Sequence, residues 1–195
     1  LAGKYDQAAD YLSRALGGEI IRRGFNLVSG FGVGIAEQTI LGAFHAVYDS
    51  AHAQPAERVL VRPFPGNAPE TKRAEVFRRH REDMIARAGA VVVLAGNKKD
   101  SLGTIVRSPG VDEEVEIALR LGKPVIPVGQ SGHVAGELWR VAMLQPHQYL
   151  PGIDSVSELR VLGDDQASID QVVAAVVGLL QKAETYASAR MASTT

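Results

Sequence analysis

The sequence predicts an α/β protein with a doubly wound, mostly parallel sheet. Short apolar runs alternate with amphipathic helical segments along the 195 residues, which is the pattern of a parallel sheet covered by helices. The clearest run, residues 90–95, is apolar throughout and ends at Gly96, as expected for a strand that is buried on both faces. In addition, glycine, arginine or lysine follows several of these runs, at the strand ends where such sheets bind ligands.

Each element follows from its local pattern. Residues 1–3 are expected to be the end of a first strand, and apolar residues at helical spacing predict a helix over 7–23. A strand at 25–29 leads through a glycine-rich loop into a helix that ends near Val47. The further elements expected are strands at 59–61, 90–95 and 124–128 and helices at 71–88, 111–121, 135–144 and 169–182. The segments expected to lack regular structure are 96–110, 145–167 and a flexible tail at 184–195, so that one domain spans 1–183.

Composition argues against several classes of function. The hydrophobic fraction of 46% and the charged fraction of 22% are ordinary for a globular protein, and no apolar stretch approaches the roughly 20 residues of a membrane span. The absence of cysteine excludes disulfides, thiolate metal sites and a cysteine nucleophile, and it is compatible with a reducing cytoplasm. A net charge of −1 argues against nucleic-acid binding, which usually needs a strongly basic face. The histidines are not at metal-ligand spacing, so no metal site is expected.

Three glycines after the strand at 25–29 form a candidate ligand loop. Gly30, Gly32 and Gly34 allow positive φ angles and a close approach of a ligand to backbone N–H groups at a helix start. The pattern is not the full dinucleotide fingerprint, because Glu37 stands near the place of its third glycine and no acidic residue ends the strand at 59–61. A tight turn that binds no ligand is the alternative.

Basic and aromatic residues follow two other strands. Arg62 ends the strand at 59–61, where a guanidinium suits a bidentate phosphate contact, and Phe64 could stack on a base. Lys98 follows the strand at 90–95 in the sequence Gly96-Asn97-Lys98, which suits a phosphorylated ligand. The alternatives are a surface arginine beside a packed phenylalanine and a solvated lysine in a turn.

The helices contribute further candidates. Arg81 lies near the boundary of the buried face of the helix at 71–88, where a long basic side chain needs a partner, and His80 is interpreted as a packed histidine. Glu113 and Glu114 follow Gly110 in the first helical turn, where the helix dipole stabilises carboxylates. One of the two could accept hydrogen bonds from ribose hydroxyls. Trp139 and Tyr149 are expected to be packing residues.

Four sequence blocks, in this order and spacing, resemble the SLOG superfamily: His80–Ile85, Gly96–Lys99, Gly110–Glu114 and Lys123–Gly129. The resemblance extends from Leu1 to about Leu150 and implies a Rossmann-like fold. It looks closest to the C-terminal sensor (STALD) domains of Thoeris antiphage effectors, in which a sirtuin-like NAD hydrolase carries a domain that binds a cyclic ADP-ribose isomer. The chain begins without an initiator methionine or a signal peptide, so we expect an upstream effector domain that is missing from this sequence.

The resemblance implies roles for single residues. Arg81 and Lys98 would hold the pyrophosphate, and Glu113 would accept a hydrogen bond from a ribose hydroxyl. Gly3, Gly32 and Gly34 would let the ligand lie against the backbone, with a weaker match at Gly3 and Lys4. The full set of candidate ligand-binding residues is Gly3, Lys4, Gly30, Gly32, Gly34, Arg62, Phe64, Arg81, Gly96, Asn97, Lys98, Gly110 and Glu113. The resemblance also implies a cytoplasmic homodimer, a higher oligomer in the longer protein, and neither a cofactor nor a catalytic residue in this segment.

Other functions stay open. Phosphoribohydrolases of the LOG branch resemble one another in an Arg-Lys pair, which here reads His80-Arg81, and in a Pro-Gly-Gly-x-Gly-Thr-x-x-Glu loop, which here reads Pro109-Gly110-Val111-Asp112-Glu113. The missing glycines and threonine predict binding without hydrolysis. The alternative is a nucleoside 5′-monophosphate phosphoribohydrolase in which Glu113 or Glu114 is the catalytic carboxylate and Arg81 orients the phosphate. A sensor joined to a TIR domain and, more remotely, a single-stranded DNA binder are further alternatives.

Overall fold

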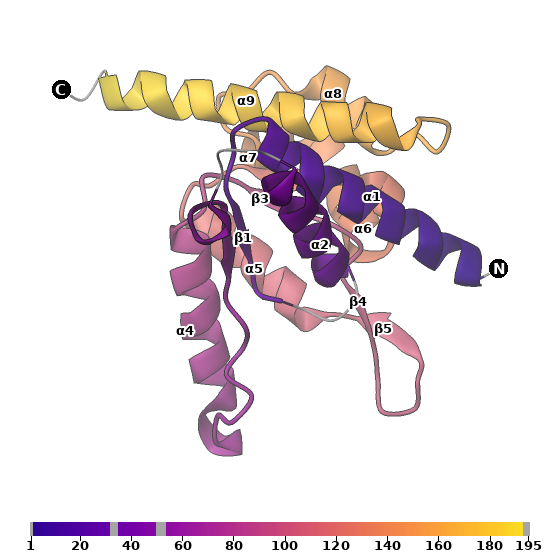
Figure 1. The fold of residues 1–195 in the computed structure, drawn as a ribbon, viewed down its shortest axis with the longest axis vertical. Coiled ribbons are helices and arrows are strands. Elements are labelled where there is room, and N and C mark those ends of the chain that lie inside the picture. The colour runs from indigo at the N-terminus through magenta and orange to yellow at the C-terminus, as the bar shows by residue number, and fades with distance from the viewer. Residues whose placement is uncertain (1, 32–34, 50–53, 193–195) are drawn as a thin grey trace. The chain divides into compact units, whose positions relative to one another are not determined.

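The computed structural model describes residues 2–31, 35–49 and 54–192 (Figure 1). The chain divides into two compact units, Leu1–Arg87 and Ala88–Thr195. In the described residues, the strands form two parallel pairs, one in each unit, and one antiparallel hairpin. Helices make up most of the remainder, so the α/β class with parallel strands is confirmed.

The first unit contains one parallel strand pair and the helices around it. Its elements are α1 (Ala2–Arg22), β1 (Leu27–Ser29), α2 (Ile35–Tyr48), α3 (Pro55–Arg58), β2 (Val59–Val61), the 3₁₀ helix η1 (Glu70–Lys72) and α4 (Arg73–Ala86). Strand β1 pairs with β2 from Leu27 opposite Val59 to Ser29 opposite Val61, so both strands end at the same edge. Their apolar residues pack with α1 and α2 in a core that includes Ile21, Ile40, Ala43, Val47 and Val59.

Helices α1 and α2 approach each other so closely that glycine is required on both. A Cβ atom on Gly17 would overlap the carbonyl oxygen of Thr39, and a Cβ atom on Gly42 would overlap the carbonyl oxygen of Arg14. The two contacts are reciprocal, since each helix offers a glycine to a carbonyl of the other. The backbones of the two helices are therefore in direct contact, and Figure 1 shows them side by side.

The start of the chain differs from the expected structure. The prediction of a strand end at residues 1–3 is wrong for Ala2 and Gly3, which belong to α1, and Leu1 lies outside the described residues. The face of α1 that carries Leu12, Leu16 and Ile20 is buried. The apolar residues that predict a helix from residue 7 therefore belong to a longer helix. The short segment before residue 7 contains alanine and polar residues, which can extend this helix toward the N-terminus.

The second unit also contains a parallel strand pair. Its elements are β3 (Val91–Val93), β4 (Asn97–Lys99), β5 (Ile105–Arg107), α5 (Pro109–Arg120), β6 (Val125–Pro127), the 3₁₀ helix η2 (Gly129–Ser131), α6 (His133–Leu144), α7 (Pro146–Tyr149), α8 (Val156–Leu162) and α9 (Ile169–Ala192). Strand β3 pairs with β6 from Val91 opposite Val125 to Val93 opposite Pro127, and all three residues of β6 are buried.

The segment predicted to be a loop at 96–110 contains an antiparallel hairpin. Strands β4 and β5 pair from Asn97 opposite Arg107 to Lys99 opposite Ile105. The carboxylate of Asp100 closes the turn, because its Oδ1 accepts hydrogen bonds from the backbone N–H groups of Leu102 and Thr104, both at 2.9 Å. The hairpin is specified by this turn rather than by apolar alternation, which explains why hydrophobic periodicity does not detect it.

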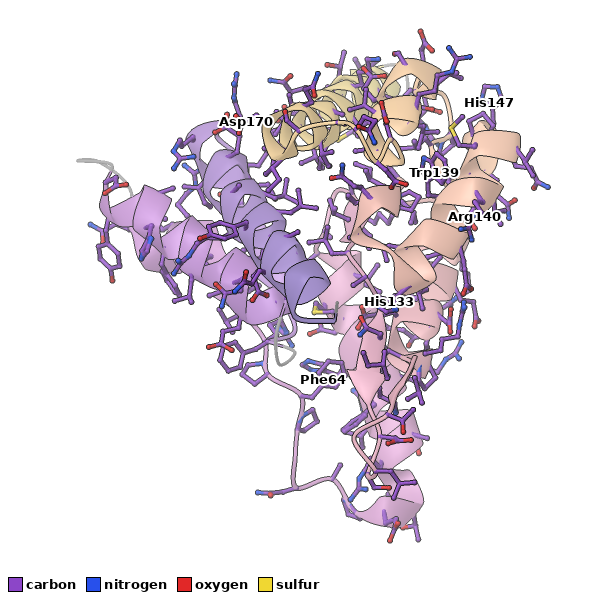
Figure 2. The ribbon with its side chains drawn as sticks, turned by 90° about the vertical axis from the view of Figure 1, so that its right-hand side faces the viewer. Phe64, His133, Trp139, Arg140, His147 and Asp170 are labelled. Carbon is purple, nitrogen blue, oxygen red and sulfur yellow. The ribbon has the colours of Figure 1, made fainter. Side chains whose placement is uncertain are left out.

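The region predicted to be irregular at 145–167 contains α7 and α8. Helix α8 is fixed to α6 by Trp139, which is labelled in Figure 2. Its indole Nε1 donates a hydrogen bond to the carbonyl oxygen of Leu159 at 2.6 Å. Leu159 is fully buried and Tyr149 is 5% exposed, so the packing roles of Trp139 and Tyr149 are confirmed. Both helices are too short to give a clear amphipathic period in the sequence.

The last helix is longer than predicted. The sequence predicts that α9 ends near Lys182 and that a tail follows from 184 onward, but the helix continues to Ala192. The added residues include several alanines, which favour a helix even where little of its surface is buried. In the described part of the chain, no helix is both long and apolar enough to span a bilayer.

Candidate functional site

Three strained residues mark the loops that follow the parallel strands. In the described part of the chain, the non-glycine residues with positive φ are Phe31 (54°), Ala95 (47°) and His133 (52°). Phe31 comes two residues after β1, Ala95 two residues after β3, and His133 follows β6 by way of η2. Such a backbone conformation is costly for an L-amino acid and is often found at functional sites. In open α/β sheets, ligands bind at these same carboxyl strand ends.

In the first unit, backbone hydrogen bonds join the ends of β1 and β2. The N–H of Arg62 donates to the carbonyl oxygen of Ser29 at 2.8 Å, and the N–H of Phe31 donates to the hydroxyl of Ser29 at 3.4 Å. A Cβ atom on Gly30 would lie 3.1 Å from Cε2 of Phe64, so Gly30 lets this ring lie close to the backbone. The other two glycines of the candidate loop, Gly32 and Gly34, lie outside the described residues.

Phe64, in the segment after β2, is the centre of an aromatic cluster with residues of α4. Its ring centroid lies 5.1 Å from that of Phe77, in an edge-to-face arrangement, and 4.7 Å from that of His80. The guanidinium carbon of Arg81 lies 4.8 Å from the Phe64 centroid and 5.9 Å from the Phe77 centroid. Two aromatic rings therefore support the cation of Arg81.

Arg62 is also tied to α4. Its guanidinium forms an ion pair with Asp83, which accepts a further hydrogen bond from Arg87 at 3.3 Å. Nε2 of His80 lies 3.0 Å from the carbonyl oxygen of Arg62, so the interpretation of His80 as a packed histidine is confirmed. The first unit thus brings three predicted site residues, Arg62, Phe64 and Arg81, to one place between the end of β2 and α4.

Gly3 and Lys4 are not at a strand end. Both residues lie in the first turn of α1, and the strand end predicted from the sequence at residues 1–3 is replaced by helix at Ala2 and Gly3. Their contact with a ligand stays a prediction, and it is no longer supported by a position at a strand end.

In the second unit, Ser131 connects the loops after β3 and β6. Its hydroxyl accepts a hydrogen bond from the N–H of Ala95 at 2.9 Å and donates one to the carbonyl oxygen of Val128 at 2.5 Å. The carbonyl oxygen of Ala95 in turn accepts from the N–H of Ala135 at 2.8 Å, in the first turn of α6. The unusual conformation of Ala95 is therefore held on both sides of the residue.

Gly96 is the point where the chain turns from β3 into the hairpin. Its φ angle is +90°, and a Cβ atom there would lie 2.7 Å from Cβ of Val134. The carbonyl oxygen of Gly96 accepts a hydrogen bond from the N–H of Ser108 at 3.0 Å, which closes the base of the hairpin. Lys98 lies in β4 opposite Val106, and its side chain is exposed. Its neighbour Asn97 is half-buried.

The hairpin leads directly into α5. Pro109 occupies the first helical turn, where its missing N–H costs nothing, and Gly110 follows it. Glu113 is half-buried in the same part of the helix, close to the N-terminal backbone dipole.

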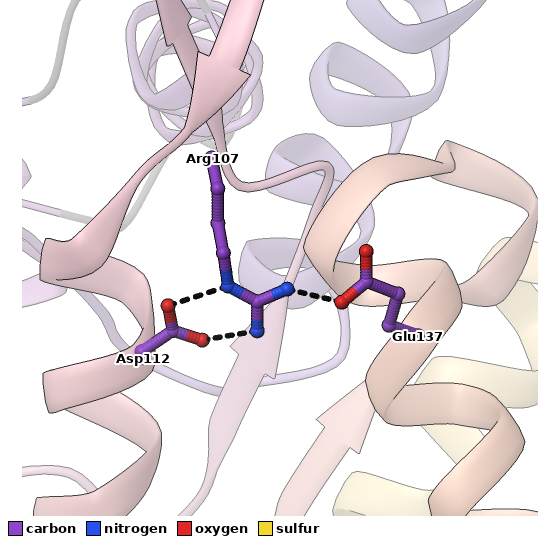
Figure 3. A network of polar contacts seen from close by, with 3 residues as sticks. All are labelled: Arg107, Asp112 and Glu137. Atoms are coloured by element: carbon purple, nitrogen blue, oxygen red, sulfur yellow. Dashed lines mark hydrogen bonds and ion pairs between the residues drawn. The ribbon is translucent and has the colours of Figure 1, made fainter.

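Arg107 forms a cluster of charged residues that is not apparent from the sequence. Its Nε and Nη2 donate to the two carboxylate oxygens of Asp112 at 2.7 and 2.5 Å, and its Nη1 donates to Glu137 on α6 (Figure 3). The hydrogen bonds to Asp112 and then Glu137 raise the pKa of the Arg107 guanidinium further above its usual value. Asp112 is close in sequence, but Glu137 is far along the chain, so no local pattern reveals this cluster.

The predicted residues fall into two groups, one in each unit. Arg62, Phe64 and Arg81 belong to the first unit, and Gly96, Asn97, Lys98, Gly110 and Glu113 belong to the second. The joint action of Arg81 and Lys98 on one ligand stays a prediction. In the described residues, no group of three His, Asp or Glu side chains is arranged to hold a metal ion.

Parallel strand pairs with glycine-containing, strained loops at their carboxyl ends are typical of Rossmann-like α/β proteins. The chain belongs to the Sir2- and TIR-associating SLOG (STALD) family, whose model matches residues 3–183. The SLOG resemblance and the Rossmann-like fold are thereby confirmed.

Three curated relatives have the same name, NAD(+) hydrolase ThsA. The protein from Bacillus cereus (strain MSX-D12) is 31% identical over 175 residues, which are 89% of this chain and 36% of the relative. The protein from Cytobacillus dafuensis is 26% identical over 174 residues, 88% of this chain and 35% of the relative. The protein from Acinetobacter baumannii (strain 532279) is 32% identical over 157 residues, 76% of this chain and 32% of the relative. The chain thus spans about a third of the length of these relatives.

Proposed function

We propose that this chain is a sensor domain that binds a cyclic ADP-ribose isomer and thereby activates an attached NAD-hydrolysing domain in antiphage defence. The observation that carries the proposal is the placement of strained loops, glycines and cationic side chains after the parallel strands of a STALD-family chain. The name of its relatives, NAD(+) hydrolase, supports the nature of the attached domain.

The negative charge of the ligand is complementary to two cationic candidates, Arg81 on α4 and Lys98 on the hairpin. A cyclic ADP-ribose isomer carries a diphosphate with two negative charges, an adenine and two riboses. Arg81 offers a planar guanidinium that can make two parallel hydrogen bonds to one phosphate, and Lys98 offers an exposed ammonium for the other. Glu113 would accept a hydrogen bond from a ribose hydroxyl.

Signalling through this domain requires two states. The ligand activates the attached hydrolase only if it binds one assembly of the full-length protein more tightly than the other. We propose a homodimer through this domain and a higher oligomer of the longer protein as those assemblies, in the cytoplasm. In such a longer protein, the isomer that binds this chain is expected to raise the rate of NAD consumption.

The loop before α5 supports binding without hydrolysis. In this chain the helix begins at Pro109, and the carboxylate of Asp112 is held by Arg107. The segment lacks the additional glycines that would let the backbone wrap around a monophosphate.

Isothermal titration calorimetry of the 195-residue chain tests the proposal. Cyclic ADP-ribose isomers, linear ADP-ribose, NAD and AMP are titrated separately into the same folded sample. One cyclic isomer is expected to bind at least about tenfold more tightly than AMP, a difference of roughly 1.4 kcal/mol. If a folded sample binds none of these nucleotides, the proposal is wrong.

Incubation with AMP separates the sensor from the phosphoribohydrolase. No free adenine is expected, as measured by chromatography after long incubation. Release of adenine that disappears in Glu113→Gln would establish the hydrolase alternative in place of the sensor.

A further inference from the structure

We infer that Arg107 is a positioning residue: its guanidinium clasps Asp112 and Glu137 and thereby fixes the β4–β5 hairpin that carries Lys98. The inference rests on the proposed function only for the ligand contact of Lys98. The ordering of the hairpin by Arg107 concerns the chain without ligand and can be tested by itself.

The hairpin has little to hold it in place. Each strand has three residues, and the tip and one edge are exposed, with Leu102 at 88% and Ile105 at 46% of full exposure. Isolated two-stranded hairpins are marginally stable in water, so the order of this one depends on what its base is attached to. The turn around Asp100 shapes the tip but does not connect the hairpin to another element.

Arg107 provides such an attachment at the base. It lies directly opposite Asn97, and the next pair along the hairpin is Lys98 with Val106. Nε and Nη2 are used on Asp112 of α5 and Nη1 on Glu137 of α6, so a single side chain connects the hairpin to two helices. The backbone hydrogen bond from the N–H of Ser108 to the carbonyl oxygen of Gly96 also closes the base.

The three-nitrogen geometry requires arginine. A guanidinium is a planar fork that can pair with one carboxylate through two nitrogens and reach a second carboxylate with the third. The single ammonium of a lysine cannot reproduce this fork. By fixing the hairpin before a ligand arrives, Arg107 lowers the conformational entropy that is lost when Lys98 binds a phosphate.

Hydrogen–deuterium exchange of the ligand-free chain tests the clasp directly. Peptides that cover residues 97–107 are compared between the unaltered chain and the variants Arg107→Ala, Arg107→Lys and Glu137→Gln. We expect Arg107→Ala to speed exchange in the hairpin roughly three- to tenfold, and the other two variants to give intermediate increases. Arg140→Ala, which removes an exposed arginine of α6, is the matched control and should exchange as the unaltered chain does (Figure 2).

The same variants are then titrated with the cyclic ADP-ribose isomer that binds the unaltered chain. The loss of affinity is expected to follow the gain in exchange, with Arg107→Ala the largest, Arg107→Lys partly rescued and Arg140→Ala unchanged. Thermal melting by circular dichroism confirms that each variant is folded.

Two results overturn the inference. Unchanged exchange in Arg107→Ala means that the clasp does not order the hairpin, whatever happens to affinity. Faster exchange with unchanged affinity means that hairpin order does not position Lys98. If no nucleotide binds even the unaltered chain, the proposed function fails instead, and the exchange data still decide whether Arg107 orders the hairpin.

Discussion

The guanidinium carbon of Arg81 lies 4.8 Å from the centre of the Phe64 ring, although 17 positions separate the two residues in the sequence. Phe64 follows β2 and Arg81 lies on α4, so the contact joins a strand-end loop to a helix of the first unit. A ring face attracts the cation and fixes its position without neutralising its charge. The side chain predicted to hold a phosphate is thus oriented by the side chain predicted to stack on a base.

Replacing Arg81 by alanine should weaken nucleotide binding at least about tenfold. The variant loses a charge-assisted hydrogen bond to phosphate worth roughly 1.5–3 kcal/mol. Calorimetric titration with the cyclic isomer measures the effect. Arg79→Ala, two residues earlier on α4 and exposed, should bind as the unaltered chain does. Equal affinity of the folded Arg81→Ala variant would show that the phosphate assignment is wrong.

Replacing Phe64 by leucine should weaken binding only through Arg81. Leucine keeps an apolar side chain but removes the ring face, which is worth about 0.5–1 kcal/mol to a partly exposed cation. We expect a two- to fivefold loss of affinity, an order-of-magnitude conversion of that energy. In the Arg81→Ala background, Phe64→Leu should cause almost no further loss, which a double-mutant cycle measures. Fully additive losses would instead indicate that Phe64 contacts the ligand itself.

Replacing Lys98 by alanine should reduce affinity by about the same factor as Arg81→Ala. The exposed ammonium of Lys98 makes little contribution to folding. The free energy of unfolding of the variant should therefore differ from that of the unaltered chain by no more than about 0.5 kcal/mol, as for most surface substitutions. Lys72→Ala is the control, because Lys72, the last residue of η1, is also an exposed lysine. A titration in which both lysine variants bind equally well would remove Lys98 from the site.

Replacing Gly96 by alanine should destabilise the protein by about 2 kcal/mol or more. The new methyl group would lie 2.7 Å from Cβ of Val134, on a backbone whose φ of +90° is already unfavourable for alanine. Gly122→Ala is the matched control, because Gly122 also has a positive φ, 64°, but a Cβ atom added there would have no atom within 4 Å. Urea denaturation should show a cost of about 1 kcal/mol for Gly122→Ala. Equal costs for both variants would contradict the close contact at Gly96.

The contact between Glu158 and Lys182 should make stability depend on pH. Burial would raise the pKa of Glu158, but the hydrogen bonds from Lys182 at 2.6 Å and Ser157 at 2.8 Å outweigh it, so the pKa is lowered. The folded state therefore binds the proton less tightly than the unfolded state. The contribution to stability is present above the unfolded pKa of about 4.3 and is lost as the pH falls through the lower folded value.

Glu158→Gln measures this contribution. The variant should be less stable than the unaltered chain by about 0.5–1 kcal/mol at neutral pH, and the difference should shrink in acid below the folded pKa. Denaturation at both pH values gives the comparison, and Glu184→Gln, an exposed residue on the helix that carries Lys182, is the control. A difference that stays constant down to low pH would show that the carboxylate charge is not responsible.

The buried strands could be predicted because their sequences carry the necessary information locally. Residues 91–93 and 125–127 are apolar runs bounded by glycine or proline, and the structure pairs them in parallel. Helical periodicity also predicts that Arg81 lies at the edge of the buried face of α4. Its position over Phe64 could not be predicted, because it depends on how the loop after β2 folds back onto that helix.

Other features depend on contacts that no single segment reveals. The hairpin at 97–107 is mostly polar, and its pairing is directed by the side chain of Asp100, so apolar alternation gives no signal. The cluster around Arg107 includes Glu137, 30 residues away, which only the packing of α6 brings near. The same limit applies to the start of the chain, where Ala2 and Gly3 resemble a strand end but belong to a long helix that packs against α2.

The reciprocal glycine contacts of α1 and α2 limit how the first unit can respond to a ligand. Each helix places a carbonyl where the other would otherwise carry a side chain, so sliding one helix along the other would bring these carbonyls toward neighbouring residues that do carry side chains. Shear between these helices is therefore expected to be a costly way to transmit a signal. A movement that begins at the end of β1 is therefore expected to carry both helices together.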